Sequence, residues 1–189
     1  MDFIKRTYGS AYHVLDRAQV SVCFPGYPQP WHGESDAAHR YRVKRCTAHI
    51  DGLLREGAEK RRHLREHHAF ILGIPMLDVP ATASPVVVWE GSHRIVQQAF
   101  QRKLKGIAVD EWGDQDITQF YHSLRERIFD GCTPTEVAAR PGECYIVHRL
   151  ALHGVRPWHA SAEDSTAEGR MISYFRPELT SKGDWLLLP

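Results

Sequence analysis

With 189 residues the chain can bury a substantial hydrophobic core, so we expect a single domain over residues 1–189. Its 24 Lys and Arg residues against 23 Asp and Glu leave a formal net charge of +1, which is too small to attract nucleic acid or an anionic membrane. The four cysteines form no CxxC pair, and no stretch has the apolar length of a signal peptide or membrane span, so a reduced cytoplasmic protein is expected.

The first predicted elements are a loop, a strand and a charged segment. Residues 23–31, CFPGYPQPW, combine prolines and a glycine with aromatic residues, which is typical of an irregular loop packed on the fold. From Arg40 to His49, β-branched and aromatic residues fall on alternate positions, so a strand ending at His49 is predicted. The charged run 55–68 predicts a solvated helix or an extended mobile loop. For its basic and histidine-rich part, residues 60–68, the functional alternative is a lid or a binding segment for a substrate phosphate or carboxylate.

Buried strands and two helices are predicted in the middle of the chain. Residues 69–77 and 86–89 are apolar enough for buried strands. After Ser92, a candidate N-cap, apolar residues recur at helical spacing, and the same spacing returns from Asp116 to Phe129. Both helices are expected to support the core.

The last part of the chain predicts short strands. Residues 143–148, 153–156 and 170–176 have strand character, and a polar loop is predicted at 161–169. Many short strands with two helices favour a mainly β fold, whose antiparallel core is packed against a few outer helices.

The most informative local feature is the His49-Ile50-Asp51 sequence. Side chains two apart on a strand point to the same face, so the imidazole and the carboxylate are expected together. Such a short motif alone is weak evidence. A second imidazole, His153, lies on another predicted strand, and two histidines with one carboxylate form the facial triad that suits iron(II).

A facial triad leaves three positions open on an octahedral metal, two for a keto acid and one for dioxygen. A guanidinium is suited to the far carboxylate of the keto acid, because its fork matches a carboxylate in two hydrogen bonds. Arg170 opens the strand that follows His153 and is our candidate for this anchor. Arg176, on the same strand face, and Arg156 are the alternatives.

Several segments together resemble the phytanoyl-CoA dioxygenase family of iron(II)- and 2-oxoglutarate-dependent oxygenases. They are HID at 49–51, WEGSHR at 89–94, PGECYIVHRLALHG at 141–154 and GRMISYFRPE at 169–178. The resemblance implies a double-stranded β-helix, the jelly-roll fold shared with cupins, with its core over about residues 40–178. It also implies metal ligands at His49, Asp51 and His153 and a 2-oxoglutarate anchor at Arg170. The GSH element makes Trp89, Ser92 and His93 candidates for lining the substrate pocket.

The function implied by this resemblance is a dioxygenase that binds Fe(II), 2-oxoglutarate, dioxygen and a small-molecule substrate. Hydroxylation with release of succinate and carbon dioxide is expected, because the related halogenases lack the carboxylate ligand that Asp51 supplies. Two alternatives stay open: a cupin-like metal-dependent isomerase or oxygenase that does not use 2-oxoglutarate, and a non-catalytic jelly-roll binding protein. A hydrolytic zinc site is disfavoured, since the helix-borne motif of zinc hydrolases is missing from the sequence. The sequence selects neither a particular substrate nor an oligomeric state.

Overall fold

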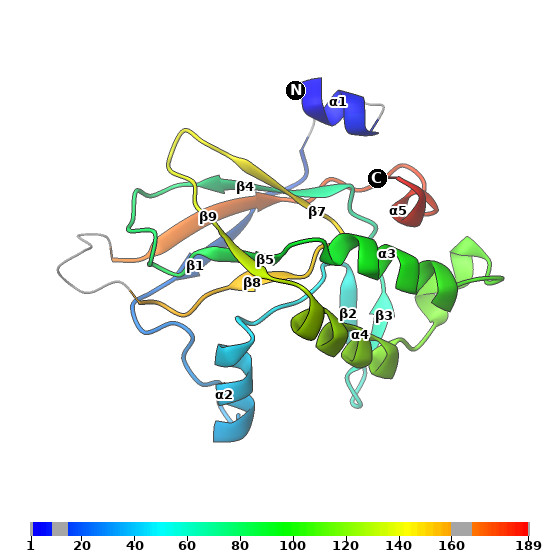
Figure 1. Ribbon diagram of the computed structural model, residues 1–189, viewed down its shortest axis with the longest axis horizontal. Helices are drawn as coiled ribbons and strands as arrows, with labels where there is room; N and C mark the ends of the chain where they lie inside the picture. The colour runs from blue at the N-terminus through cyan, green and yellow to red at the C-terminus, as the bar shows by residue number, and fades with distance from the viewer. Residues whose placement is uncertain (1, 9–14, 160–167, 189) are drawn as a thin grey trace.

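The computed structural model describes residues 2–8, 15–159 and 168–188 of the chain (Figure 1). Most of the polar segment predicted at 161–169 therefore lies outside the described residues. In chain order the elements are α1 (Asp2–Tyr8), β1 (Gln19–Cys23), α2 (Asp36–Lys44), β2 (Leu53–Glu56), β3 (Arg61–Leu64), β4 (Phe70–Pro75), β5 (Val86–Trp89), α3 (Ser92–Lys103), η1 (Val109–Asp114), α4 (Thr118–Gly131), β6 (Pro134–Val137), β7 (Tyr145–His148), β8 (His153–Val155), β9 (Arg170–Phe175) and α5 (Asp184–Leu187).

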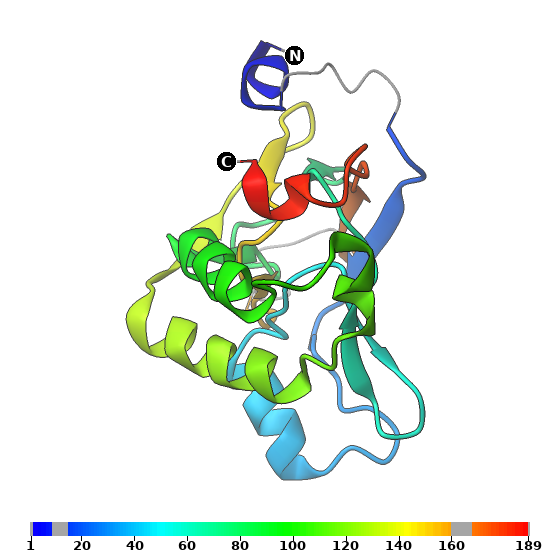
Figure 2. The ribbon, with the colours of Figure 1, turned by 90° about the vertical axis from the view of Figure 1, so that its right-hand side faces the viewer.

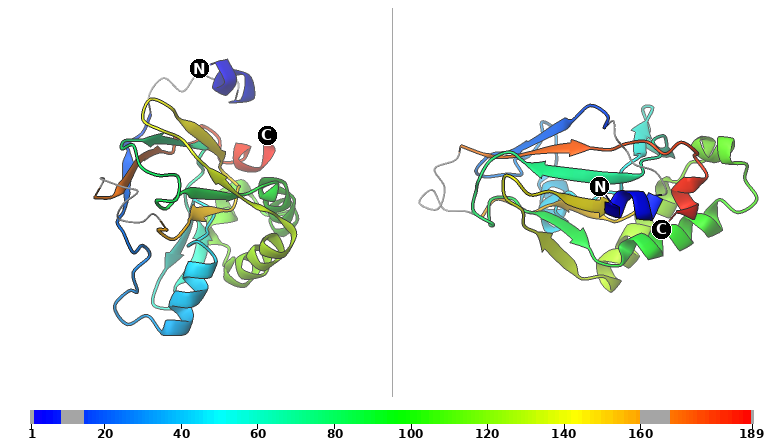
Figure 3. Two further views of the ribbon diagram at one scale, coloured as in Figure 1. Left: turned by 60° about the vertical axis from the view of Figure 1, so that its left-hand side comes forward. Right: turned by 90° about the horizontal axis from the view of Figure 1, so that it is seen from above.

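Two antiparallel sheets form the core, as Figure 3 shows from two further directions. One sheet has the strand order β1-β9-β4-β7 and the other β6-β5-β8. His49 forms an antiparallel bridge with His153 of β8, so the segment around His49 extends the second sheet. From β4 onward the chain passes back and forth between the two sheets, from β4 to β5 and β6, then to β7, β8 and β9, which is the arrangement of a double-stranded β-helix. The predicted mainly β jelly-roll core with a few packing helices is confirmed.

The pattern of β9 shows how this core turns side chains inward. Arg170 and Ile172 are buried, whereas Met171 between them is only partly covered. Because side chains alternate along a strand, Tyr174 and the following Arg176 share the face of Arg170. One strand thus presents two guanidinium groups and a phenol to the interior of the β-helix.

Helices close one end of the β-helix (Figure 2). Apolar side chains of α3 and α4 recur at helical spacing and join the main core, as the sequence predicts. Trp185 of α5 packs edge-on against Phe100 of α3, with ring centroids 5.1 Å apart. The buried Arg149 guanidinium donates to the carbonyls of Trp185 and Leu188, which holds the last turn against the body. Among the described residues, no helix has the length and apolar character needed to span a membrane.

The predicted strand from Arg40 to His49 is wrong for most of its length. Residues 36–44 form the helix α2, which begins at Ser35, whose hydroxyl accepts a hydrogen bond from the Ala38 amide at 3.3 Å. This N-cap outweighs the alternation of apolar residues, because α2 lies on the surface and buries none of its side chains. Cys46 and Thr47 then adopt φ values of 53° and 52°, and the chain turns into the bridge at His49.

The charged run 55–68 is neither a helix nor an irregular loop. It continues β2 into a β-hairpin with β3, in which Leu53 pairs with Leu64 and Glu56 with Arg61. The charges are compatible with a hairpin because several have partners: Arg65 binds the Glu56 carboxylate at 2.6 Å, and Arg61 binds Asp116 at 2.6 Å. Residues 53–64 therefore form a β-hairpin directly after Asp51.

Candidate metal centre

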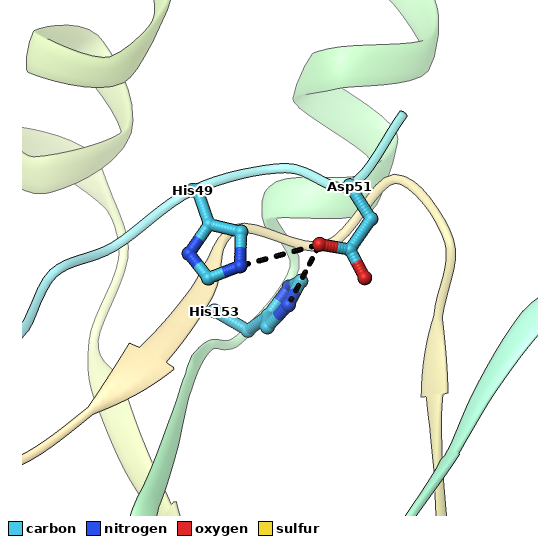
Figure 4. A group of neighbouring side chains, drawn as sticks. All are labelled: His49, Asp51 and His153. Carbon is cyan, nitrogen blue, oxygen red and sulfur yellow. Dashed lines mark ion pairs between the residues drawn. The ribbon is translucent and has the colours of Figure 1, made fainter. Parts of the chain in front are cut away.

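The three predicted metal ligands lie close together (Figure 4). One candidate ligand atom from each of His49, Asp51 and His153 lies within 4.8 Å of the other two. The Nε2 atom of His49 lies 3.2 Å from Oδ1 of Asp51, and Nε2 of His153 lies 3.6 Å from the same oxygen. The side chains of Asp51 and His153 are each 10% exposed, whereas His49 is 45% exposed and forms the open side of the cluster.

Main-chain pairing holds the two histidines side by side. The His49 amide donates to the His153 carbonyl at 2.8 Å, and the His153 amide donates to the His49 carbonyl at 3.0 Å. The imidazole ring centroids are consequently 4.6 Å apart. Residues from distant parts of the sequence thus meet through two backbone hydrogen bonds.

Gly154 permits this close approach. A Cβ atom at this position would collide with the Cys46 carbonyl oxygen and would lie 3.0 Å from the Ala48 Cα. Both contacts are backbone atoms, which cannot rotate away. Only glycine at position 154 therefore lets the segment from Cys46 to Ala48 lie this close to β8, which places His49 beside His153.

A Gly154→Ala variant is expected to separate the two segments that carry the cluster. Overpacking of this kind costs about 1–3 kcal/mol of stability. We expect a lower melting temperature together with weaker binding of divalent metal, measured by calorimetry. Gly131→Ala is the matched control, since a Cβ there meets nothing within 4 Å. Unchanged metal affinity in Gly154→Ala would contradict the role of this contact.

The orientation of both rings is fixed by carbonyl groups two residues earlier in the chain. His49 Nδ1 lies 3.0 Å from the Thr47 oxygen, and His153 Nδ1 lies 2.9 Å from the Ala151 oxygen. A carbonyl only accepts hydrogen bonds, so each Nδ1 carries a hydrogen, and Nε2 of each ring is the atom that faces Asp51 and can bind a metal.

This set of donors fits a divalent metal ion. Two imidazole lone pairs facing one carboxylate oxygen repel each other unless a proton or a metal cation lies between them. Two histidines and one carboxylate with further positions open are the ligand set of non-haem iron(II) sites. The three residues present therefore fit the metal that the motif predicts.

The electrostatics of the cluster keep His153 and Asp51 in the protonation states that bind a metal. Burial lowers the pKa of His153 to about 4, although Asp51 opposes the shift, so the ring is neutral at pH 7. Burial alone would raise the pKa of Asp51, but its polar neighbours, of which the Arg176 guanidinium is charged at pH 7, outweigh burial and hold the pKa well below its usual range. Asp51 is therefore ionised.

Arg176 lies beside the cluster, in a cavity of about 910 Å³ that the three candidate ligands also line. Its Nε donates to Asp51 Oδ2, and its Nη1 donates to the Gln19 side chain at 2.7 Å. Oδ1 of Asp51 is left to face the two histidines. Arg176 thus neutralises the carboxylate and fixes its orientation.

Arg170 lies deeper on the same strand and lines a second cavity of about 460 Å³. The side chain is buried; Nη2 donates to the Tyr174 hydroxyl at 3.2 Å, and Nη1 contacts the Cys23 sulfur at 3.7 Å. No carboxylate among the described residues forms an ion pair with it. Val86 lines both cavities, so the two spaces are neighbours.

The other predicted site residues lie elsewhere. Trp89 is in the core, with its ring 5.2 Å from that of Phe129. The Ser92 hydroxyl is buried and accepts a hydrogen bond from the Leu152 amide at 2.9 Å, and the His93 ring lies 4.8 Å from that of His148. None of Trp89, Ser92 and His93 is among the described residues that line the 910 Å³ cavity. Arg156, the third candidate anchor, is paired with Glu136 at 2.7 Å.

Tyr174 is a site residue that the sequence analysis missed. It lines the larger cavity and accepts hydrogen bonds from Arg170 and from the Tyr145 hydroxyl, the latter at 3.0 Å. Burial raises the pKa of Tyr145 far above its ordinary value, so Tyr145 stays protonated and donates. The available signal was the alternation of β9, which puts Tyr174 between the two arginines on one face.

No protein-family model and no curated protein sequence matches the chain. Solved structures that match the chain include the following three. The non-haem alpha-ketoglutarate-dependent carbocyclase SnoK from nogalamycin biosynthesis is 16% identical with a TM-score of 0.37, over 69% of this chain and 42% of that one. An N-substituted L-amino acid dioxygenase from Burkholderia ambifaria is 14% identical with a TM-score of 0.38, over 84% and 48% of the two chains. The structure of this dioxygenase in complex with alpha-ketoglutarate is 11% identical with a TM-score of 0.36, over 83% of this chain and 47% of that one. The chain thus matches less than half the length of each structure, and similarity at this level does not bear on activity.

Proposed function

We propose that the protein is an Fe(II)- and 2-oxoglutarate-dependent dioxygenase of the phytanoyl-CoA dioxygenase type that hydroxylates a small molecule. The convergence of His49 Nε2, His153 Nε2 and Asp51 Oδ1 carries the proposal, because it supplies the ligand set of a non-haem iron(II) site. Bound iron would supply the oxygen chemistry, in which 2-oxoglutarate yields succinate and carbon dioxide and one oxygen atom passes to the substrate.

Arg170 is proposed to bind the far carboxylate of 2-oxoglutarate. A buried guanidinium is costly unless an anion pairs with it, and no carboxylate of the described residues does so. Arg176, in contrast, is already paired with Asp51. The Tyr174 hydroxyl accepts from both Arg170 and Tyr145, so its own hydrogen can be donated to a ligand in the larger cavity.

One observation favours a second candidate, a metal-dependent jelly-roll enzyme that does not use 2-oxoglutarate. Arg170 lines the smaller cavity, whereas the metal ligands line the larger one. If no keto acid spans the two spaces, Arg170 has no role in the reaction.

An anaerobic titration with Fe(II) and then 2-oxoglutarate separates the two candidates. The dioxygenase proposal expects a visible metal-to-ligand absorption band that grows with the keto acid, and succinate formation once oxygen is admitted. His49→Ala should remove the band, because it removes a proposed ligand, and His93→Ala is the control histidine outside the cluster. Iron binding without a band on addition of 2-oxoglutarate would instead support the second candidate.

A further inference from the structure

Two arginines face each other across the β2–β3 hairpin. Arg55 is the direct cross-strand partner of Arg62, and both line the cavity that contains the candidate metal ligands. Like charges in directly opposite positions destabilise a pair of strands. They also share one face of the hairpin with the buried Leu53 and Leu64. The hairpin itself lies beside α4 (Figures 1 and 2).

A third arginine approaches from α4. Arg125 is 9% exposed, and its Nε has no hydrogen-bond partner among the described residues. Its guanidinium carbon lies 5.5 Å from the centroid of the Tyr121 ring, and that of Arg62 lies 4.5 Å from the same centroid. Two cations from different elements thus contact one aromatic ring.

The positive charge of this arginine cluster, defined as Arg55, Arg62 and Arg125, is not balanced within the described chain. None of the three forms an ion pair with a described carboxylate. Glu126, the neighbour of Arg125, is occupied by Arg45 at 3.2 Å and by the Tyr41 hydroxyl at 2.5 Å.

The three groups also act on one another. Burial lowers the pKa of Arg62, and the nearby charges of Arg55 and Arg125 lower it further. Burial likewise lowers the pKa of His122, followed by the charges of Arg125, Arg62 and Arg55. The protein thus holds mutually repelling cations close together, and two of them, Arg55 and Arg62, line the cavity whereas Arg125 does not. An anion bound to Arg55 and Arg62 would stabilise this arrangement.

We propose that the arginine cluster binds an oxyanion of the substrate, a carboxylate or a phosphate, and so selects a small anionic substrate. The inference deepens the proposed function and rests on it, since it assigns the group that the candidate enzyme recognises. The Tyr121 hydroxyl accepts a hydrogen bond from the Ile50 amide at 3.2 Å, so the ring beneath the cluster also contacts the segment between His49 and Asp51. The oxyanion is thereby held beside the segment that carries two of the metal ligands.

Binding of simple anions to the metal-free protein tests this inference. We expect saturable binding of inorganic phosphate or of propanoate in calorimetric titrations at constant ionic strength. Arg55→Gln and Arg62→Gln should each weaken it about tenfold or more, because each removes a charge-assisted hydrogen bond to the anion, which is stronger than a hydrogen bond between neutral groups. Tighter binding of phosphate would identify a phosphorylated substrate, and preference for propanoate a carboxylic acid.

Lys60→Gln is the matched control, since it removes one charge from the same hairpin at a position that does not line the cavity. Arg55 is exposed, so its variant remains informative if the partly buried Arg62 is needed for folding. Absence of saturable binding of both anions, or an equal loss in Lys60→Gln, would overturn the inference. The dioxygenase proposal is tested separately and is wrong if the absorption band with 2-oxoglutarate is absent. Anion binding that depends on Arg55 could still be observed in that case.

Discussion

Asp51→Ala is expected to weaken Fe(II) binding by at least about 100-fold. Loss of an outer partner of a metal ligand already costs about 10–100-fold, and a ligand itself should cost no less. The change removes the carboxylate oxygen that both imidazole Nε2 atoms face. Anaerobic calorimetry with Fe(II), compared with the wild-type protein, measures the effect.

Asp16→Ala is the control for this experiment. Asp16 lines the same cavity, but its carboxylate accepts a hydrogen bond from the Arg176 amide and is not part of the cluster. We expect this variant to bind iron nearly as well as the wild type. Equal iron affinity in Asp51→Ala and the wild type would refute the candidate metal centre.

Arg170→Gln is expected to weaken 2-oxoglutarate binding by about 100-fold with little change in iron affinity. Removing one partner of a buried charge pair costs about 2–5 kcal/mol, and glutamine retains part of the side-chain volume. The measurement is the concentration of 2-oxoglutarate that gives half of the absorption band on the iron-loaded protein. Circular dichroism reports whether the variant keeps the fold.

Arg176→Gln tests the alternative anchor. Because Arg176 binds Asp51, its loss should change the affinity for Fe(II) more than the affinity for 2-oxoglutarate. If Arg176→Gln loses 2-oxoglutarate binding while Arg170→Gln keeps it, the anchor is Arg176, which the sequence analysis leaves open.

The sequence predicts that His49, Asp51 and His153 lie together, but the strand on which that prediction depends is only partly present. The same-face argument for His49 and Asp51 assumes a strand from Arg40, yet residues 36–44 are helical. The two side chains still meet because extended pairing starts at His49 itself, through its bridge to His153. Membership of the phytanoyl-CoA dioxygenase family stays a prediction from the motifs.

The features that the sequence did not predict depend on contacts between distant segments. Strand β1, which the sequence analysis does not predict, is defined by its pairing with β9. The charges of 55–68 are typical of a solvated segment, and only ion pairs such as that between Arg61 and Asp116 show that a hairpin accommodates them. The partner of Arg176 is equally non-local. Local periodicity carries no information about such pairs.

The distance in sequence between His49 and His153 has a consequence for the order of events during synthesis. The amino-terminal pair of ligands leaves the ribosome long before β8 exists, and β1 receives its partner only when β9 has been made. Contacts of such high sequence separation form late in folding. A nascent chain that ends before β8 therefore has at most two of the three proposed ligands available, and tight metal binding would indicate that β8 has been made and paired with the segment at His49.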